Sequence, residues 1–283
     1  MPSENHLSTR TVLAFLDGED SPDILNPIHS TAVAKAYGFK GALVGGVTVY
    51  GWTVPAILEA LGEGWLEDGW VDVRFRRPVY AGDFMTVAVT GRDGGIFELV
   101  MENQDGEHCL AGSVGMGLAP WLSELRRPQL LQAEPRPKDL PHLTPANAPV
   151  CEDLRPLGID LTAELATAYA HEKQRDDSAR WTGSDARIHP GWIAAQMTPL
   201  LHHSYDYGPS IHTRSQIQHL AAARPGQRVT FAGTFVETFE RKGHHYGVID
   251  GVMLAEDGQE LARLRHTTIF QLAQPEGSPE APT

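Results

Sequence analysis

A histidine in a short turn is the side chain of this sequence best suited to acid–base chemistry. His29 ends the turn Asn26-Pro27-Ile28-His29, and Asp23 stands a few residues before it. Adding water to a double bond requires a base that activates the water and an acid that protonates carbon. A carboxylate and an imidazole beside one water molecule can divide these tasks. We therefore predict that His29 and Asp23 are catalytic, and that Asn26 orients the turn or contacts the substrate.

A glycine-rich bend follows this turn. Gly45 and Gly46 precede an apolar run that begins at Val47. The first backbone N–H groups of a helix have no intrahelical acceptor, and glycine lets a ligand approach the backbone closely. Such groups can hold the negative charge that develops on a carbonyl oxygen. We predict that Gly45, Gly46 and Val47 form an oxyanion site of this kind.

The stretch from Asp23 to Tyr50 resembles the active-site segment of the MaoC-like (R)-specific enoyl-CoA hydratases and 3-hydroxyacyl-thioester dehydratases. The matching positions are Asn26, Pro27, Ile28, His29, Ala36, Gly38, Phe39, Gly41 and Gly46. Two positions depart from the family. Ile24 stands where the family has aspartate, which makes Asp23 the nearest carboxylate, and Gly45 stands where the family often has histidine.

This resemblance implies a hotdog fold and activity on acyl thioesters. The expected reaction is hydration of a 2-enoyl thioester or dehydration of a 3-hydroxyacyl thioester. The acyl group would be carried by coenzyme A or an acyl carrier protein, and no cofactor is expected. Because position 24 is isoleucine, two alternatives stay open: a thioesterase of the same fold, and a non-catalytic acyl-thioester-binding protein.

Several other polar residues are weaker candidates for the site. Arg74 and Arg76 share one face of a predicted strand, where they would contact the phosphates of coenzyme A or simply lie at a solvated sheet edge. The resemblance places His212 where hotdog strands face the substrate tunnel. In the second half, Asp185 and His189 precede a helix and form either a second catalytic pair or a structural helix entry.

Two histidine clusters raise the question of a metal site. His202 and His203 are adjacent, as are His244 and His245. Neighbouring histidines on a helix point in different directions, and neither cluster has the spacing of a zinc motif. We predict no metal site.

The elements that position these residues can be predicted from periodicity and turn chemistry. Residues 31–37 form a short helix that Gly38 can end. The run from Val47 to Leu61 is apolar on most faces, as in a buried helix, but Pro55 implies a break near Gly51-Trp52. Strands are predicted at the following alternating or β-rich segments: 71–75, 84–89, 96–102 and 108–116.

The second half of the chain repeats this order. Arg224-Pro225-Gly226-Gln227 and Glu256-Asp257-Gly258-Gln259 repeat the turn chemistry of Ala81-Gly82-Asp83 and Gln104-Asp105-Gly106-Glu107. We predict an α+β fold of two hotdog modules, each a central helix wrapped by a curved antiparallel sheet. The predicted division is an N-terminal hotdog (10–118) with the candidate active site, a proline-rich linker (119–150), a C-terminal hotdog (151–273) and a disordered tail (274–283).

Composition limits the classes of partner. The chain has 283 residues and a formal net charge of −13, which argues against a nucleic-acid backbone because that partner requires a basic surface. Its two cysteines, Cys109 and Cys151, do not indicate a disulfide framework, so a reducing cytoplasm is expected. No signal peptide or membrane span is predicted. A monomeric double hotdog or a homodimer is expected.

Overall fold

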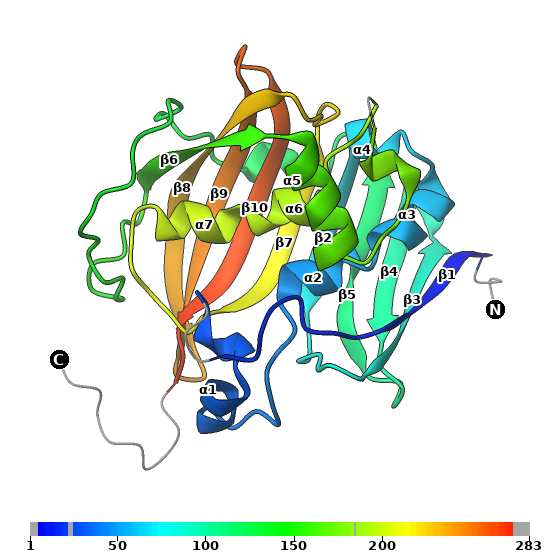
Figure 1. Cartoon of the computed structure of the whole chain (residues 1–283), viewed down its shortest axis with the longest axis horizontal. Coiled ribbons are helices and arrows are strands. Elements are labelled where there is room, and N and C mark those ends of the chain that lie inside the picture. Colours follow the sequence, from blue (N-terminus) through cyan, green and yellow to red (C-terminus); the bar gives the residue numbers. More distant parts are fainter. Residues whose placement is uncertain (1–4, 22–24, 184, 274–283) are drawn as a thin grey trace.

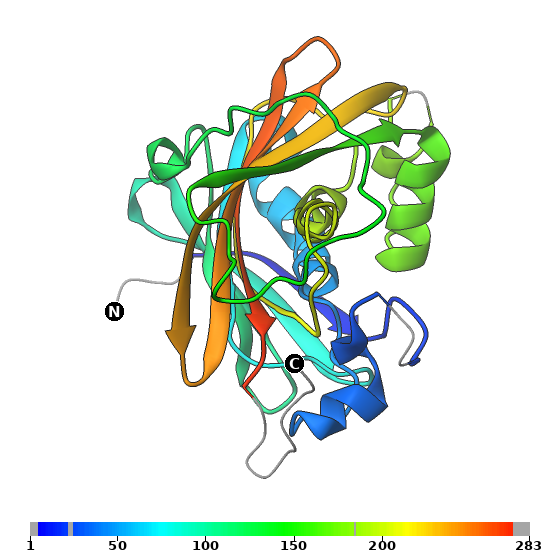
Figure 2. The same cartoon turned by 90° about the vertical axis from the view of Figure 1, so that its left-hand side faces the viewer.

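The computed structural model describes residues 5–21, 25–183 and 185–273. Its strands form one sheet in the order β1-β3-β4-β5-β2-β7-β10-β9-β8-β6, and every neighbouring pair is antiparallel. The central helices lie on one face of this curved sheet (Figures 1 and 2). The predictions that Asp23 is catalytic and that residues 274–283 are disordered concern positions outside the described residues.

The strands are β1 (Asn5–Leu13), β2 (Gly69–Phe75), β3 (Phe84–Gly91), β4 (Ile96–Glu102), β5 (His108–Met116), β6 (Glu152–Leu161), β7 (Ile211–His219), β8 (Gln227–Arg241), β9 (His244–Ala255) and β10 (Glu260–Gln271). The α-helices are α1 (Thr31–Ala36), α2 (Gly46–Gly51), α3 (Val54–Leu61), α4 (Trp65–Asp68), α5 (Ala163–Ala168), α6 (Pro190–Ala195) and α7 (Met197–His202). Short helical turns are η1 (Pro27–His29), η2 (Asp93–Gly95), η3 (Leu122–Glu124), η4 (Tyr169–Lys173) and η5 (Ala179–Trp181).

Two repeated hydrogen bonds show that the halves share one architecture. The Val44 N–H donates to the Val79 carbonyl at 2.9 Å, and the Ile188 N–H donates to the Ala223 carbonyl at 2.9 Å. Both residues of the second pair follow their counterparts by 144 positions, from 44 to 188 and from 79 to 223. The predicted α+β fold of two hotdog modules is therefore confirmed.

The central helix of each half is broken rather than continuous. In the first half, α2 ends at Gly51 and α3 begins at Val54, with Pro55 in its first turn. Proline is tolerated there because the first N–H groups of a helix have no intrahelical acceptor. The break that Pro55 predicts is confirmed, and it allows the helix to follow the curvature of the sheet.

Glycines let the two central helices approach closely. A Cβ atom at Gly191 of α6 would lie 3.3 Å from the Cα of Gly51 in α2 and 2.9 Å from the Tyr169 hydroxyl. Any larger residue at this position would push the helices apart, and a small residue at such a crossing permits dense packing. The contact fixes the end of α2 relative to the second half.

Strands β2 and β7 join the halves into one sheet. Their register pairs Asp72 with Gln216 and Val73 with Ser215. The Asp72 carboxylate accepts hydrogen bonds from the Arg214 guanidinium at 2.6 and 2.9 Å and from the Gln216 amide at 3.2 Å. On the opposite face of β2, Val71 and Val73 are fully buried, as the period of a strand requires.

The first part of the chain between β5 and β6 crosses the face of the sheet opposite the helices, and its later part contacts the end of α7, where Arg136 donates to the His202 carbonyl (Figure 2). The Arg126 N–H donates to the carboxylate of Asp250 at 2.7 Å, and Arg265 forms an ion pair with the same buried carboxylate at 2.6 Å. Trp121 packs edge-on against Trp70 with ring centroids 6.4 Å apart. Segment 119–150 is therefore packed against both halves. No helix in the described part of the chain is long and apolar enough to cross a bilayer.

Candidate active site

A cavity of about 470 Å³ lies where the start of α2 meets β7, and both halves line it. The first half contributes Asn26, His29 and the bend at Gly45–Val47, and the second half contributes His212. Apolar walls come from Val49, Phe75, Pro199 and Ile269. Of the two predicted arginines, Arg76 lines this cavity and Arg74 does not, and Arg77 and Lys242 line it as well. The sequence candidates that are brought together here are Asn26, His29, Gly45, Gly46, Val47, Arg76 and His212.

The imidazole of His29 is held in a defined orientation. Its Nδ1 lies 2.7 Å from the Leu43 carbonyl oxygen, and a carbonyl can only accept, so Nδ1 carries the hydrogen. Its Nε2 lies 3.2 Å from the side-chain amide nitrogen of Asn26. That nitrogen is a donor, so Nε2 presents its lone pair. These two contacts therefore select the tautomer in which Nδ1 carries the hydrogen and Nε2 is the basic atom.

The second half of the chain holds Asn26 in place. Its amide nitrogen donates to the Ser210 carbonyl at 2.9 Å, and its amide oxygen accepts from the Ser210 N–H at 3.0 Å. Pro27 begins η1 directly after it, as the restricted backbone before proline favours. The predicted orienting role of Asn26 thus has a physical basis in this paired contact.

The start of α2 presents two backbone donors to the cavity. The N–H groups of Thr48 and Val49 donate to the Gly45 carbonyl at 2.9 and 3.0 Å. The N–H groups of Gly46 and Val47, in the first two helical positions, have no acceptor within the helix. The oxyanion role of Gly45–Val47 stays a prediction, and the residues of this bend line the cavity as that role requires.

His212 approaches this bend from β7. Its Nε2 lies 2.8 Å from the Ser215 hydroxyl and 3.1 Å from the Arg214 carbonyl oxygen, so Nε2 carries the hydrogen. Its Nδ1 is buried without a hydrogen-bond partner among the described residues. It lies 3.1 Å from the point that a Cβ atom at Gly46 would occupy. Burial lowers the pKa of His212 to about 4, so the ring is neutral at pH 7.

Asp17 and Thr48 lie beside this bend without lining the cavity, and the sequence pattern indicated neither of them. The Thr48 hydroxyl donates to the Asp17 carboxylate at 2.6 Å. A Cβ atom at Gly45 would lie 3.5 Å from the Thr48 hydroxyl, 3.7 Å from His29 Cε1 and 3.9 Å from the Asp17 carboxylate. Asp17 precedes the turn cluster 18–22 and stands nine positions before Asn26. No local motif links it to His29.

Arg74 does not reach the cavity. It projects from β2 on the exposed face of the sheet, whereas Arg76 follows the last residue of the strand and lies at the cavity mouth. The Arg76 backbone N–H donates to the Cys109 carbonyl at 2.7 Å. Beyond the strand end the pleat no longer governs which way a side chain points, so the two arginines separate.

The second-half candidates, Asp185 and His189, do not line the cavity, and they differ in burial. His189 is buried and caps α6, because its Nδ1 accepts from the Gly191 N–H at 3.0 Å. Its ring packs against Trp181 with centroids 4.7 Å apart, and burial lowers its pKa to about 4. Asp185 is exposed, and its backbone carbonyl accepts from Arg187 at 2.8 Å. The geometry favours the structural alternative for both residues.

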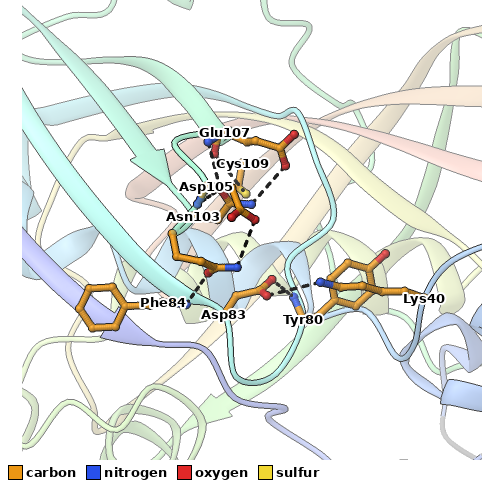
Figure 3. Close-up of polar contacts among 9 residues, drawn as sticks. Lys40, Tyr80, Asp83, Phe84, Asn103, Asp105, Glu107 and Cys109 are labelled. Atoms are coloured by element: carbon orange, nitrogen blue, oxygen red, sulfur yellow. Dashed lines mark hydrogen bonds and ion pairs between the residues drawn. The ribbon is translucent and has the colours of Figure 1, made fainter.

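A polar cluster fixes one wall of the cavity (Figure 3). The buried carboxylate of Asp83 accepts from the Tyr80 N–H at 2.8 Å and forms an ion pair with Lys40 at 3.5 Å. The Lys40 ammonium also lies 4.1 Å from the centre of the Tyr80 ring. These contacts tie the loop after α1, which carries Phe39 and Leu43, to the turn before β3.

Cys109, also drawn in Figure 3, has a structural rather than a reactive environment. The Cys109 thiol contacts the Glu107 carbonyl oxygen at 3.6 Å, and burial raises the pKa of the thiol to about 11. A protonated, buried thiol is a poor nucleophile. Within the described ranges, no group of three or more histidine, cysteine or acidic side chains is arranged to hold a metal ion.

Comparison with known proteins establishes the fold. Neither a family model nor a curated protein matches this sequence. A solved structure described as a MaoC domain protein dehydratase, from Chloroflexus aurantiacus J-10-fl, superposes with a TM-score of 0.60 at 12% identity. The match covers 95% of this chain and 96% of that one.

Two further solved structures are similar over most of their length. A conserved hypothetical protein from Mycobacterium tuberculosis with a double hotdog fold has a TM-score of 0.58 at 12% identity, covering 88% of this chain and 89% of that one. A protein described as an oleoyl thioesterase, from Lactobacillus plantarum, has a TM-score of 0.51 at 10% identity, covering 96% and 98%. The chain therefore has the double hotdog fold that is found in MaoC-like dehydratases.

Proposed function

We propose that this protein processes acyl thioesters in the cavity between its halves, by hydration of a 2-enoyl thioester or the reverse dehydration. The observation that carries the proposal is the position of His29. An imidazole whose Nδ1 is held by the Leu43 carbonyl lines the same cavity as Gly46 and Val47. A base and an oxyanion site on one cavity wall are what addition of water next to a thioester requires.

The reaction would proceed through an enolate. The thioester oxygen would accept hydrogen bonds from Gly46 and Val47 as negative charge develops on it. Water would add to C3 while Nε2 of His29 takes part in proton transfer, and the Asn26 N–H that now occupies Nε2 at 3.2 Å would give way. The apolar walls would hold the acyl chain away from solvent.

The cavity mouth suits the phosphate-bearing carrier of such a substrate. Arg76 and Lys242 are exposed there and come from different halves. A pair of cations in a protein with a net charge of −13 would attract a phosphate locally. Coenzyme A and an acyl carrier protein both present phosphopantetheine, so this contact is compatible with either.

A thioesterase activity is the second candidate. It is favoured by the isoleucine at position 24, because a site without the carboxylate of the dehydratases can still direct water at a carbonyl held by backbone donors. The similar fold of the structure described as an oleoyl thioesterase supports this alternative. A protein that binds acyl thioesters without turnover is the third alternative.

The test follows enoyl absorbance and free thiol in the same samples. Crotonyl-CoA and 2-decenoyl-CoA would be incubated with the wild type, with His29→Gln, and with the control His142→Gln, whose side chain is 64% exposed. A hydratase consumes the enoyl absorbance without releasing thiol, and His29→Gln lowers the rate about 100-fold or more. Thiol release would assign a thioesterase. Saturable binding without either change would assign a binding protein.

A further inference from the structure

Three polar side chains from separate elements converge on the backbone of Gly45. The nearest atoms to the position of a Cβ there are the Thr48 hydroxyl, His29 Cε1 and the Asp17 carboxylate oxygen, all within 4 Å. Gly45 and His29 also line the cavity. The Asp17 carboxylate, which does not itself line the cavity, and the Cε1 edge of the His29 ring thus both lie within 4 Å of one point beside this cavity-lining glycine.

Asp17 is held firmly in this position. Its carboxylate accepts the Thr48 hydroxyl at 2.6 Å, and its backbone carbonyl accepts from the Lys173 ammonium at 2.5 Å. Thr48 belongs to α2 and Lys173 to η4 of the second half. Asp17 is therefore anchored from both halves, as a group in a reacting geometry must be.

The glycine at position 45 keeps this space open. Its φ is −58°, a backbone conformation that any residue can adopt, so conformation alone does not call for glycine. A Cβ would meet its neighbours at 3.5–3.9 Å, which is ordinary van der Waals contact. Alanine would therefore fit, but its methyl group would fill the space that Asp17 and His29 share.

We propose that Asp17 is the catalytic carboxylate of this site, and that it shares with His29 a water molecule bound in front of Gly45. The inference rests on the proposed hydration reaction and names its second proton-transfer group. Asp17 would take the place of the aspartate that position 24 lacks. It reaches the site from the chain after β1 rather than from the turn that carries His29.

The proposed step conserves atoms and charge. As the water oxygen bonds to C3, the Asp17 carboxylate accepts one of its protons, and the electron pair of the C2–C3 double bond moves onto the thioester oxygen. The proton then passes through the His29 imidazole to C2, and the enolate electrons form the new C–H bond. The hydroxyl stays on C3, and both side chains return to their starting states.

Four variants test this assignment kinetically. Asp17→Asn keeps an acceptor for the Thr48 hydroxyl but removes the base, and it should lower kcat about 100-fold or more with little change in KM. Gly45→Ala should have a similar effect on kcat because it displaces the water. Glu19→Gln, an exposed neighbour on the same loop, should leave kcat unchanged, and Asp23→Asn tests the carboxylate that the sequence pattern indicated first. Thermal melting would show that each variant folds.

Crystallography provides a readout that needs no turnover. At high resolution, the wild type should show an ordered water touching both the Asp17 carboxylate and the His29 imidazole, and Gly45→Ala should lack it. If this water is present but no enoyl thioester reacts, the proposed reaction fails while the paired site stands. Absence of the water in the wild type, full activity of Asp17→Asn, or loss of activity in Asp23→Asn alone would overturn the inference.

Discussion

Asn26 and Ser210 hold each other through two hydrogen bonds that join the halves of the chain. The amide of Asn26 donates to the Ser210 carbonyl at 2.9 Å and accepts from the Ser210 N–H at 3.0 Å. The same amide nitrogen lies 3.2 Å from Nε2 of His29. The second half therefore sets the position of the candidate acid–base group in the first half.

This arrangement predicts that Asn26→Ala affects both stability and activity. The variant leaves the backbone N–H and carbonyl of buried Ser210 without partners, which should cost about 1–3 kcal/mol in the free energy of unfolding. Activity should fall as well, because His29 loses the group that orients it. Asn147→Ala is the matched control, since Asn147 also accepts a backbone N–H, at 2.7 Å from Thr144, but in an exposed turn. Urea unfolding and initial rates should show a stability loss alone for the control. Equal activity losses in both variants would contradict the role of Asn26.

The two glycines of the bend should differ in their tolerance of alanine. A Cβ at Gly46 would lie 3.1 Å from both Cβ and Nδ1 of His212, tighter than most real contacts. His212 cannot easily move, because Phe75 and His266 pack against its ring with centroids 4.6 and 4.2 Å away. Gly46→Ala should therefore cost about 1–3 kcal/mol in unfolding free energy, whereas Gly45→Ala should cost little. Denaturant melts give the unfolding free energies of the two variants directly. Equal values would show that the His212 ring moves to make room for the methyl group.

The sequence predicted much of this site because its residues belong to local patterns. The turn at Asn26–His29 and the bend at Gly45–Val47 are short segments whose backbone conformation follows from proline and glycine. The break at Pro55 follows from the missing N–H of proline. These patterns place His29 and the start of α2 without knowledge of the tertiary structure.

The rest of the site depends on contacts between distant segments. Asp17 meets Thr48 only because β1 pairs with β3 and leads the chain past the start of α2. His189 caps α6 through a local bond to the Gly191 N–H, but its burial depends on packing against Trp181. Arg74 and Arg76 differ at the cavity because the strand ends between them at Phe75, and exposed Arg74 fits the alternative of a solvated sheet edge.

Replacing Asp83 should lower the free energy of unfolding more than replacing its ion-pair partner Lys40. Asp83 is 7% exposed and accepts the Tyr80 N–H, whereas the Lys40 side chain is 64% exposed. Lys40→Ala should cost about 0–1 kcal/mol, as for exposed ion pairs. Asp83→Ala should cost about 1–3 kcal/mol because a buried backbone donor loses its acceptor. It should also raise KM, since the cavity wall carrying Phe39 and Leu43 loses its anchor. Similar unfolding free energies for the two variants would show that the ion pair, not the backbone contact, holds this wall.

The stability of the fold should fall as the pH is lowered through the range in which unfolded histidines gain protons. His219 is fully buried beside Trp65, with ring centroids 4.9 Å apart, and burial lowers its pKa from 6.5 to about 4. The folded state therefore favours the neutral ring. Above pH 6.5 both states are neutral and the full stability is present. Below it the unfolded state binds the proton first, so stability falls until about pH 4.

His219→Phe should flatten this pH dependence, because phenylalanine can pack against Trp65 but cannot bind a proton. At pH 5 the contribution of His219 to the loss should be about 2 kcal/mol. The measurement is the free energy of unfolding in urea at pH 7.5 and pH 5.0 for the wild type and the variant. Comparing the two pH differences cancels any change in packing that is independent of pH, as well as the titration of all other groups. The variant should lose about 2 kcal/mol less than the wild type between these pH values. An equal loss in both proteins would mean that His219 is protonated in the folded state, which its burial among apolar side chains opposes.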